Sequence, residues 1–556
     1  MRTLLSLAMS LGIALTAVPA GATSQATPQN QARELPELTP APDDALSRAL
    51  HSGTVSDAEY ALERVLSLFV PRPVSRRFGE VAPPAPRAAT ALLRDLALRR
   101  DQLAPHDRAT ADALLTRPTD NRANDPVDVK YGDAKARRTC TPDLCVHYVT
   151  SGPHAVDPSD SNSNGRPDFV DTVVDELQRR VWKRAIDQMG FREPKRDVQS
   201  SNNGGNGKID FYVADLGAEN PPLYGYCATD DPHLRASSGY RFSDMSAYCA
   251  FDNDYRSGQF PDQTPIKNLR VTAAHEFFHA VQFGYDLFED LWILENTAVW
   301  MEDEVHGRIN DNLQFLATSS MRHPQVPLDL GASFFEYGNF VYWKFATERF
   351  GTRLVKQVWN KADGAPGGPD LYSLRALRAT VERRSPFERT FLNFGIANFT
   401  PKKHYEKGAL YKTRVGGAPV RKRFTLGRSK RATALQKRRL DHLASAHFTF
   451  SPGNGVKRGA RLQVRVDGPG AKSKPKAALV AFDGSRVVAK RFVKLNRRGL
   501  GHARVTFRRT TRVLLLLSNA STRYRSCFRI PTSPFSCAGQ PVDQNKTFEF
   551  KAKLIQ

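Results

Sequence analysis

The sequence predicts an α+β protein of several domains, with a small helical region before the main domain and a β-sandwich after it. Three observations indicate this class. Apolar residues recur at helical spacing from 46 to 116, strand and helix patterns alternate from 131 to 400, and beyond 441 the period becomes 2. A chain of 556 residues is also too long for one core and should hold about two to four domains.

Residues 1–22 have the features of a secretory signal peptide. Arg2 precedes the apolar run LLSLAMSLGIALTAV, and the small residues PAGA follow it. We expect cleavage just after Ala22 or Ala20. A membrane anchor is the alternative, but the run is shorter than the roughly 20 residues that a spanning helix needs. The sequence therefore predicts a secreted protein, extracellular or associated with the cell surface.

Residues 23–130 are expected to form a helical N-terminal region. A leader rich in Pro, Ala, Gln and Thr comes first, and helical patterns follow in DAEYALERVLSLF, RAATALLRDLALRR and DRATADALL. Pro-rich breaks separate these patterns. A permanent N-terminal region and a propeptide that is removed on activation would look alike, so both interpretations stay open.

Residues 131–400 form the predicted main domain, of mixed α and β structure. Strands are expected in VHYVTSG, KIDFYVADL (208–216) and MSAYCAFDND (245–254). Helices are expected at about 168–189, 271–286, 292–305, 336–350, 352–361 and 371–383.

The last part of the chain is strongly basic. Residues 401–440, rich in basic residues and glycine, read as a linker, and seven short strand patterns in 441–556 predict a β-sandwich. Residues 401–556 carry 37 Lys and Arg against 6 Asp and Glu, a net charge of +31, whereas the residues before them carry 44 against 51, a net of −7. Such asymmetry indicates attraction to an anionic partner: a cell wall, a polysaccharide, a membrane or extracellular DNA. We find no nucleic-acid-binding motif, so we expect no specific nucleic-acid partner, and we expect a monomer.

Six cysteines in an exported protein suggest disulfides. Although six cysteines allow fifteen pairings, each neighbouring couple lies in a different region, which favours local pairing. A zinc site made of cysteines is the competing interpretation, but no couple has C-x-x-C spacing. The predicted pairs are Cys140–Cys145, Cys227–Cys249 and Cys527–Cys537.

The segment VTAAHEFFHAVQFGYD, residues 271–286, carries an H-E-x-x-H pattern. On a helix, His275 and His279 stack on one face and can share one metal ion. Glu276 is rotated by about 100 degrees, where it can reach a metal-activated water as a general base. The surrounding residues are apolar, and buried polar groups are costly unless something compensates them, as a metal would.

A third ligand is expected in LWILENTAVWMEDEV, where Glu295 lies sixteen positions after His279. Glu302 lies seven residues further along the same helical face, which suits a carboxylate that holds a ligating histidine. Four other residues remain alternatives for the third ligand: Glu302 itself, Glu289, Asp290 and His306.

These motifs resemble those of the glutamate zincins, which carry H-E-x-x-H on one helix and a ligating Glu on the next. The aminopeptidase branch often shows W-x-x-E-G-x-A, and this chain reads WILENTA, with Asn296 where Gly is usual. The span from about 140 to 360 is more similar still to a little-characterised group of secreted bacterial zinc metalloproteases, through NGRPDFVD, AAHEFFHAVQFGYD and a later YG-containing helix. The alternative H-E-x-x-H-x-x-G-x-x-H layout fails at Gln282 and Tyr285.

The resemblance implies a zincin-like metalloprotease domain in residues 131–400. In that architecture, strands such as 245–254 would present an edge to an extended peptide, with the helix at 271–286 beneath it. Zn²⁺ would be bound by His275, His279 and Glu295. Glu276 would deprotonate the attacking water and later carry the proton to the leaving amine. A donor to the tetrahedral oxyanion should also exist; Tyr337 is the first candidate and Tyr342 the second.

The loop DSNSNGRPDFVD, residues 160–171, has the oxygen-ligand spacing of a calcium loop. Gly165 would allow the sharp turn, and a helix before the loop, as in a true EF-hand, is not expected. The alternative is an Asx-rich turn that caps the following helix. The predicted ligands of a structural Ca²⁺ are Asp160, Asn162, Asn164, the carbonyl of Arg166, Asp168 and Asp171.

Together these features predict a secreted zinc endopeptidase that acts on proteins or peptides. A non-catalytic surface-binding protein with a structural or degenerate zincin core is one alternative. Intact His275, Glu276, His279 and Glu295 speak against it, because a structural site has no use for the base. An aminopeptidase is the other alternative, but the sequence shows no motif for holding a free α-amine.

Overall fold

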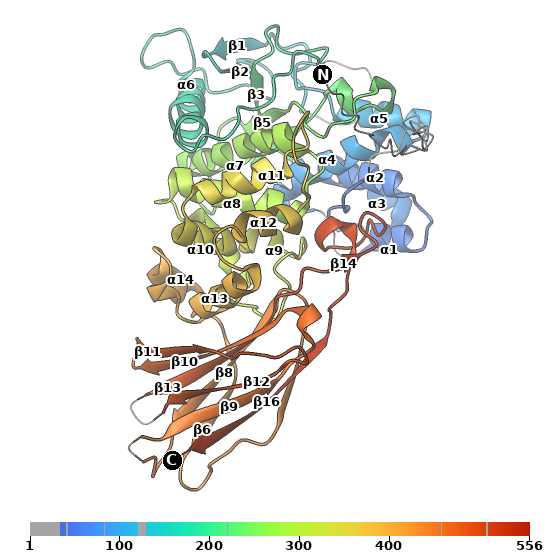
Figure 1. The fold of residues 1–556 in the computed structure, drawn as a ribbon. Helices are drawn as coiled ribbons and strands as arrows, with labels where there is room; N and C mark the ends of the chain where they lie inside the picture. Colours follow the sequence, from blue (N-terminus) through green and yellow to red (C-terminus); the bar gives the residue numbers. More distant parts are fainter. Residues whose placement is uncertain are drawn as a thin grey trace, which may run out of the picture. The chain divides into compact units, whose positions relative to one another are not determined.

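The computed structural model of the chain describes residues 34–40, 43–82, 84–120, 129–219, 221–457, 459–507 and 510–555. The predicted signal peptide lies outside these residues. Among the described residues, no helix has the length and apolar character needed to cross a membrane. The fold is α+β and ends in a β-rich region, which confirms the predicted class at this level (Figure 1).

A five-stranded sheet organises the main domain, in the order β1-β2-β3-β5-β4. Its strands are β1 (Arg137–Cys140), β2 (Leu144–Tyr148), β3 (Ile209–Ala214), β4 (Gly225–Ala228) and β5 (Tyr248–Asp252). The three inner strands are parallel, and β1 and β4 pair with them in the antiparallel direction.

The prediction that residues 245–254 form an edge strand is wrong. That segment forms β5, which lies between β3 and β4, so β4 and not β5 is the edge strand on this side of the sheet. The four residues of β4, GYCA, are all buried and show no alternation, which left them without a strand pattern in the sequence.

Two long helices pack against one face of this sheet: α7 (Pro265–Asp286) and α8 (Leu291–His306). Phe277 of α7 stacks on Phe211 of β3 and meets the edge of Trp182. The short connection between the two helices makes them antiparallel neighbours. The other elements of this part are α6 (Asp168–Asp175), a π-helical continuation at Glu176–Gln188, α9 (Phe335–Gly338), α10 (Phe340–Phe350), α11 (Arg353–Ala362), α12 (Leu374–Val381), α13 (Phe387–Phe399) and α14 (Gly408–Val415).

The N-terminal helices cover the other face of the sheet. They are α1 (Ala45–His51), α2 (Asp57–Phe69), α3 (Pro71–Phe78), α4 (Ala89–Arg99) and α5 (Pro105–Leu114). Leu93 and Leu96 of α4 share a buried apolar cluster with Tyr212 and Tyr248 of the sheet. The fully buried Arg117 forms ion pairs with Asp197 and with Asp210 of β3. This layer therefore packs on the sheet through a shared apolar cluster.

The β-rich region consists of two sheets that share one apolar core. The first has the order β11-β10-β13-β8-β6 and the second β12-β9-β16-β7. The strands are β6 (Val420–Leu426), β7 (Gln436–Leu440), β8 (Ala444–Pro452), β9 (Arg461–Asp467), β10 (Pro475–Asp483), β11 (Arg486–Phe492), β12 (Leu500–Thr506), β13 (Arg512–Asn519) and β16 (Lys546–Ile555). A loop between β13 and β16 carries the short pair β14 (Tyr524–Arg525) and β15 (Gln540–Pro541).

The linker predicted at 401–440 is also corrected, because this segment contains α14, β6 and β7. In β6 the apolar Phe424 and Leu426 face the core, while Arg421 and Arg423 are exposed. Basic residues at the exposed positions hid the alternation, since they made the segment look like a polar linker.

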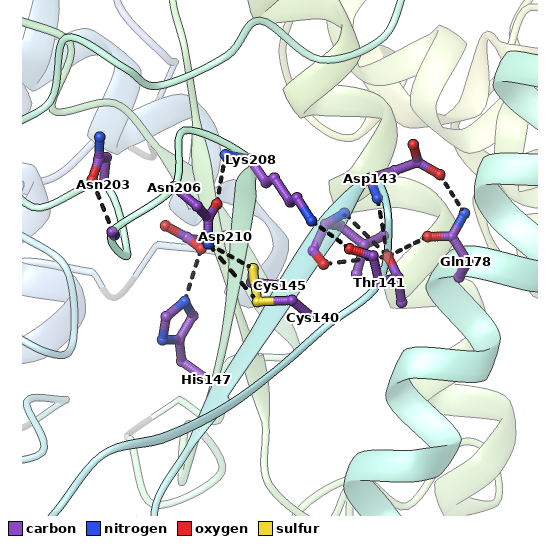
Figure 2. The surroundings of a disulfide bond; sticks show 12 residues. Cys140, Thr141, Asp143, Cys145, His147, Gln178, Asn203, Asn206, Lys208 and Asp210 are labelled. Carbon is purple, nitrogen blue, oxygen red and sulfur yellow. Dashed lines mark hydrogen bonds and ion pairs between the residues drawn. A yellow bond between two sulfur atoms is a disulfide. The ribbon is translucent and has the colours of Figure 1, made fainter.

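All three predicted disulfides are present: Cys140–Cys145, Cys227–Cys249 and Cys527–Cys537. Figure 2 shows the first, which joins the paired strands β1 and β2 beside Asn206, whose amide lies 3.2 Å from the Cys145 sulfur. In the same view His147 points to Asp210, at 2.8 Å. Three disulfides indicate that the protein folds in an oxidising compartment.

Candidate metal and catalytic site

The two histidines of α7 and one glutamate of α8 converge on a single point. The Nε2 atoms of His275 and His279 are 3.0 Å apart, and Glu295 Oε2 lies 3.3 Å and 3.6 Å from them. Among the described residues, this is the one group of His, Cys, Asp and Glu side chains with ligand atoms close enough to hold a metal ion together. All three side chains are buried.

The other ring nitrogens have partners that fix the orientation of both histidines. His275 Nδ1 donates to Glu302 Oε1 at 2.7 Å, as the sequence predicts for Glu302. His279 Nδ1 donates to Gln282 Oε1, also at 2.7 Å. When Nδ1 carries the proton in each ring, as these acceptors favour, the Nε2 lone pairs face the point between the two rings and Glu295, as metal ligation requires.

Gln282 is a site residue that the sequence analysis missed. It lies one turn after His279, and its amide nitrogen donates to Leu294 O and Thr297 Oγ1 of α8, both at 2.9 Å. Gln282 therefore joins the helix that carries the histidines to the helix that carries Glu295. The sequence does contain a signal, because Gln282 follows the ligand candidate His279 by three residues on a helix of apolar residues. The motif comparison used Gln282 only as a residue that breaks the H-E-x-x-H-x-x-G-x-x-H layout.

The charges around this point favour a cation. Burial by itself would lower the pKa of His275, but the nearby carboxylates of Glu295 and Glu302 outweigh burial and raise that pKa to about 10. Burial by itself would raise the pKa of Glu295, yet the two histidines lower it to about 2. Glu295 Oε2 is buried without a hydrogen bond. Two imidazole nitrogens and a carboxylate oxygen are the donor set that Zn²⁺ prefers, so these residues fit that ion.

Glu276 follows the ligand candidate His275 on α7 and lies against β4 at the edge of the sheet. Gly225 of β4 allows this close approach, since a Cβ there would lie 2.8 Å from Thr272 and 3.3 Å from Glu276 Cγ. The Cys227–Cys249 disulfide ties β4 to β5 directly under the backbone of Glu276, whose carbonyl lies 3.0 Å from the Cys227 sulfur. The edge strand and the general-base candidate are therefore held side by side.

Residues of the N-terminal region form hydrogen bonds with polar groups of this site. Thr90 Oγ1 donates to Glu276 Oε2 at 2.8 Å and accepts from the Cys227 N–H of β4 at 2.8 Å. Tyr337 O–H donates to the backbone carbonyl of Arg87 at 3.0 Å. Sequence analysis did not single out Thr90 or Arg87, because nothing local connects α4 with α7.

The two predicted tyrosines differ in position. The ring of Tyr337 lies 6.4 Å from that of His275, between centroids, so Tyr337 borders the site. Tyr342 instead packs against Trp343 and Phe394 in the core. Next to Tyr337, burial raises the pKa of Glu336 to about 7, and the nearby Glu295 contributes to this shift.

The alternative third ligands are engaged elsewhere. Glu289 accepts from the backbone of Ser373, and Asp290 accepts from the Cys537 N–H at 2.9 Å. His306 pairs with Glu176. Glu302 contacts the outer nitrogen of His275 and therefore supports a ligand.

The predicted calcium loop folds around the side chain of Asp171, which lies in the first turn of α6. Asp171 accepts from the amides of Asn162 (3.0 Å) and Asn164 (2.6 Å) and from Arg166 Nε (2.7 Å). Two further aspartates hold backbone N–H groups: Asp160 accepts from Gly165 at 2.8 Å, and Asp168 accepts from Ser161 at 3.0 Å. Gly165 has φ +83, as a sharp turn requires. The five predicted side chains and the Arg166 carbonyl thus lie in one loop, which is exposed at residues 161–165 and half-buried at Asp160, Arg166, Asp168 and Asp171.

Comparisons with known proteins do not assign a family. No family model matches the chain, and no curated protein matches it. Among solved structures, the pre-peptidase C-terminal domain of a collagenase from Bacillus anthracis matches with TM-score 0.15 and 13% identity, over 24% of this chain and 97% of that one. The lysozyme inhibitor PliG of Aeromonas hydrophila matches with TM-score 0.14 and 11% identity, over 24% and 98%. A family GH115 4-O-methyl-α-glucuronidase matches with TM-score 0.13 and 8% identity, over 66% and 54%. Scores this low support no statement about function.

Proposed function

We propose that the protein is a secreted zinc-dependent endopeptidase with a zincin-like catalytic domain. The observation that carries the proposal is the convergence of His275, His279 and Glu295, with Glu276 on the same helix beside them. A structural zinc site needs no adjacent base, whereas hydrolysis needs one. The disulfides agree with an exported protein, as the predicted signal peptide requires.

Each residue then has a defined role in peptide hydrolysis. His275, His279 and Glu295 would hold Zn²⁺, which supplies Lewis acidity when bound. Glu276 accepts the proton of the attacking water and returns it to the leaving amine. Tyr337 O–H donates to the substrate carbonyl oxygen as negative charge develops there. The edge strand β4 pairs with the backbone of an extended peptide.

The test combines metal analysis with a single isosteric substitution. We expect the purified protein to contain zinc and to hydrolyse casein in a reaction that chelation stops and added zinc restores. Glu276→Gln should retain the zinc and lose activity by at least about a hundredfold, because general-base catalysis contributes roughly 10²–10⁴. Zinc-free protein that still hydrolyses casein, or equal activity of the variant, would reject the mechanism.

Two further roles remain proposals. The loop at residues 160–171 would bind a structural Ca²⁺, supported by its oxygen-ligand spacing and by the contacts of Asn162 and Asn164 with Asp171. The basic β-rich region would hold the enzyme near an anionic surface, supported by its net charge of +31 over residues 401–556.

A further inference from the structure

The N-terminal segment at residues 84–90 meets the proposed catalytic groups through three separate contacts. A backbone carbonyl, that of Arg87, accepts from Tyr337 O–H at 3.0 Å. A hydroxyl, that of Thr90, reaches Glu276 at 2.8 Å and also receives the N–H of Cys227 on the edge strand. These groups are the ones that a peptide substrate would use: the carbonyl donor, the base and the strand N–H.

The side chain of Arg87 fills a pocket that matches a guanidinium in charge and shape. Its Nη2 lies 2.9 Å from Asp311 Oδ2, and its Nη1 lies 3.5 Å from Glu302 Oε1. The guanidinium carbon lies 5.1 Å from the ring centre of Tyr224 and 5.4 Å from that of Phe315. Two carboxylates and two aromatic faces form a set that recognises arginine.

The side chains that surround the Arg87 guanidinium are themselves buried or held by hydrogen bonds. The Asp311 side chain is only 4% exposed, and Gln314 Nε2 donates to the same Oδ2 that holds Arg87, at 2.8 Å. Glu302 in turn holds the metal-ligand candidate His275. The pocket therefore shares a wall with the metal site, where a substrate side chain next to the reacting bond would lie.

We propose that residues 84–90 act as an intrachain pseudosubstrate, and that the Asp311 pocket is the subsite for an arginine side chain of the substrate. This inference rests on the proposed peptidase function and adds a substrate class to it: peptides with a basic residue near the cleaved bond. The segment must leave the site before such a peptide can enter, so the chain in this arrangement is held inactive.

A binding experiment tests the pseudosubstrate without relying on turnover. All variants are made in the full chain with Glu276→Gln, so that no peptide is cleaved. The probe is a fluorescent peptide with the sequence of residues 84–92, PAPRAATAL, and a second probe has alanine in place of the arginine. We expect Arg87→Gln to bind the arginine peptide at least tenfold more tightly than the Glu276→Gln chain, because its own segment no longer fills the pocket.

Two controls separate this effect from a general loosening of the N-terminal region. Arg100→Gln removes an ion pair to Asp112 that lies between N-terminal elements, and we expect it to leave peptide binding unchanged. Asp311→Asn added to Arg87→Gln should abolish the preference for the arginine peptide over the alanine peptide. If Asp311→Asn lowers the melting temperature so far that the chain unfolds, Gln314→Ala weakens the same pocket more mildly and should reduce the preference.

The outcomes distinguish this inference from the proposed function. Equal peptide binding by Arg87→Gln and its parent chain, or equal binding of both peptides, would overturn the pseudosubstrate and the subsite. If the peptide binds as expected but Arg87→Gln with an intact Glu276 hydrolyses nothing, the proposed peptidase activity is wrong and the arginine pocket stands. In the active chain, Arg87→Gln should also raise hydrolysis of small arginine peptides above that of the natural sequence.

Discussion

At the level of single residues, the chemistry of the site depends on which nitrogen each histidine presents. Glu302 and Gln282 each accept a hydrogen bond from the Nδ1–H of one histidine, which leaves both Nε2 atoms available to a metal ion. The two partners are not equivalent. Glu302 brings a negative charge, whereas Gln282 is neutral and also bonds to α8. Gln282 therefore contacts His279 and also joins the two helices that carry the ligand candidates.

This role gives a prediction for Gln282→Ala. We expect the variant to bind zinc roughly 10- to 100-fold more weakly, the usual cost of losing such a supporting hydrogen bond. Competition with a chelator of known affinity measures the effect. Gln178→Ala, which removes hydrogen bonds to Asp143 and Thr141 far along the chain from the site, is the matched control. Unchanged zinc affinity in Gln282→Ala would show that His279 needs no such support.

The same residues show how far the sequence could predict the site. His275, His279 and Glu295 were predictable because helical spacing alone places the first two on one face and an apolar helix makes a lone glutamate conspicuous. Thr90 and Arg87 were not, because their roles arise from contacts across more than 180 positions of sequence, set by how α4 packs on β4.

At the level of elements, helices and strands were predicted correctly where their apolar pattern was long. The prediction failed where the pattern was short or was hidden by basic residues. The 22 residues of α7 contain several turns of apolar spacing, so that helix was clear. By contrast, β4 has four residues, all buried, and β6 carries arginines on its exposed face. Their places in the sheets follow from pairing with distant strands, which local patterns do not encode.

The loop at residues 160–171 gives a prediction about metal removal at this scale. With Ca²⁺ bound, we expect the oxygens of Asp160, Asn162 and Asp171 to turn toward the ion. Because ligand binding to the folded state stabilises it, a calcium-selective chelator should lower the melting temperature by several degrees, and added Ca²⁺ should restore it. Asp171→Asn should abolish this response. Equal melting temperatures with and without chelator would leave the loop as an Asx-rich turn.

At the level of the whole molecule, three regions meet at the connection between α7 and α8. Glu37 of the N-terminal region accepts from the Leu291 N–H at 2.6 Å, and Asp290 accepts from the Cys537 N–H of the β-rich region at 2.9 Å. The Leu38 N–H also donates to the Pro531 carbonyl at 2.9 Å. The Cys527–Cys537 disulfide stiffens the loop that makes these contacts. The N-terminal region and the β-rich region are therefore coupled to the helices that carry the metal-ligand candidates.

The charge asymmetry along the chain has a structural counterpart on the outer face of the β12-β9-β16-β7 sheet. There His502, Arg465 and Lys551 lie opposite one another on three neighbouring strands, all exposed. Arg465 and Lys551 are like charges in directly opposite positions, which destabilise a sheet. An anionic partner would offset that repulsion.

We therefore predict that this face binds an acidic polysaccharide, with polygalacturonate as the probe and neutral dextran as the control polymer. Arg465→Glu with Lys551→Glu should weaken binding by roughly tenfold or more, since each basic group near an anionic surface contributes on the order of 1 kcal/mol and about 1.4 kcal/mol corresponds to tenfold. Arg180→Glu with Lys183→Glu, two exposed residues near α6, changes the net charge equally and should have little effect. Binding should also fall steeply between about 0.1 M and 1 M salt, because the Debye length shrinks from roughly 10 Å to 3 Å. Equal losses in both double variants would mean that net charge alone, and not this face, attracts the polymer.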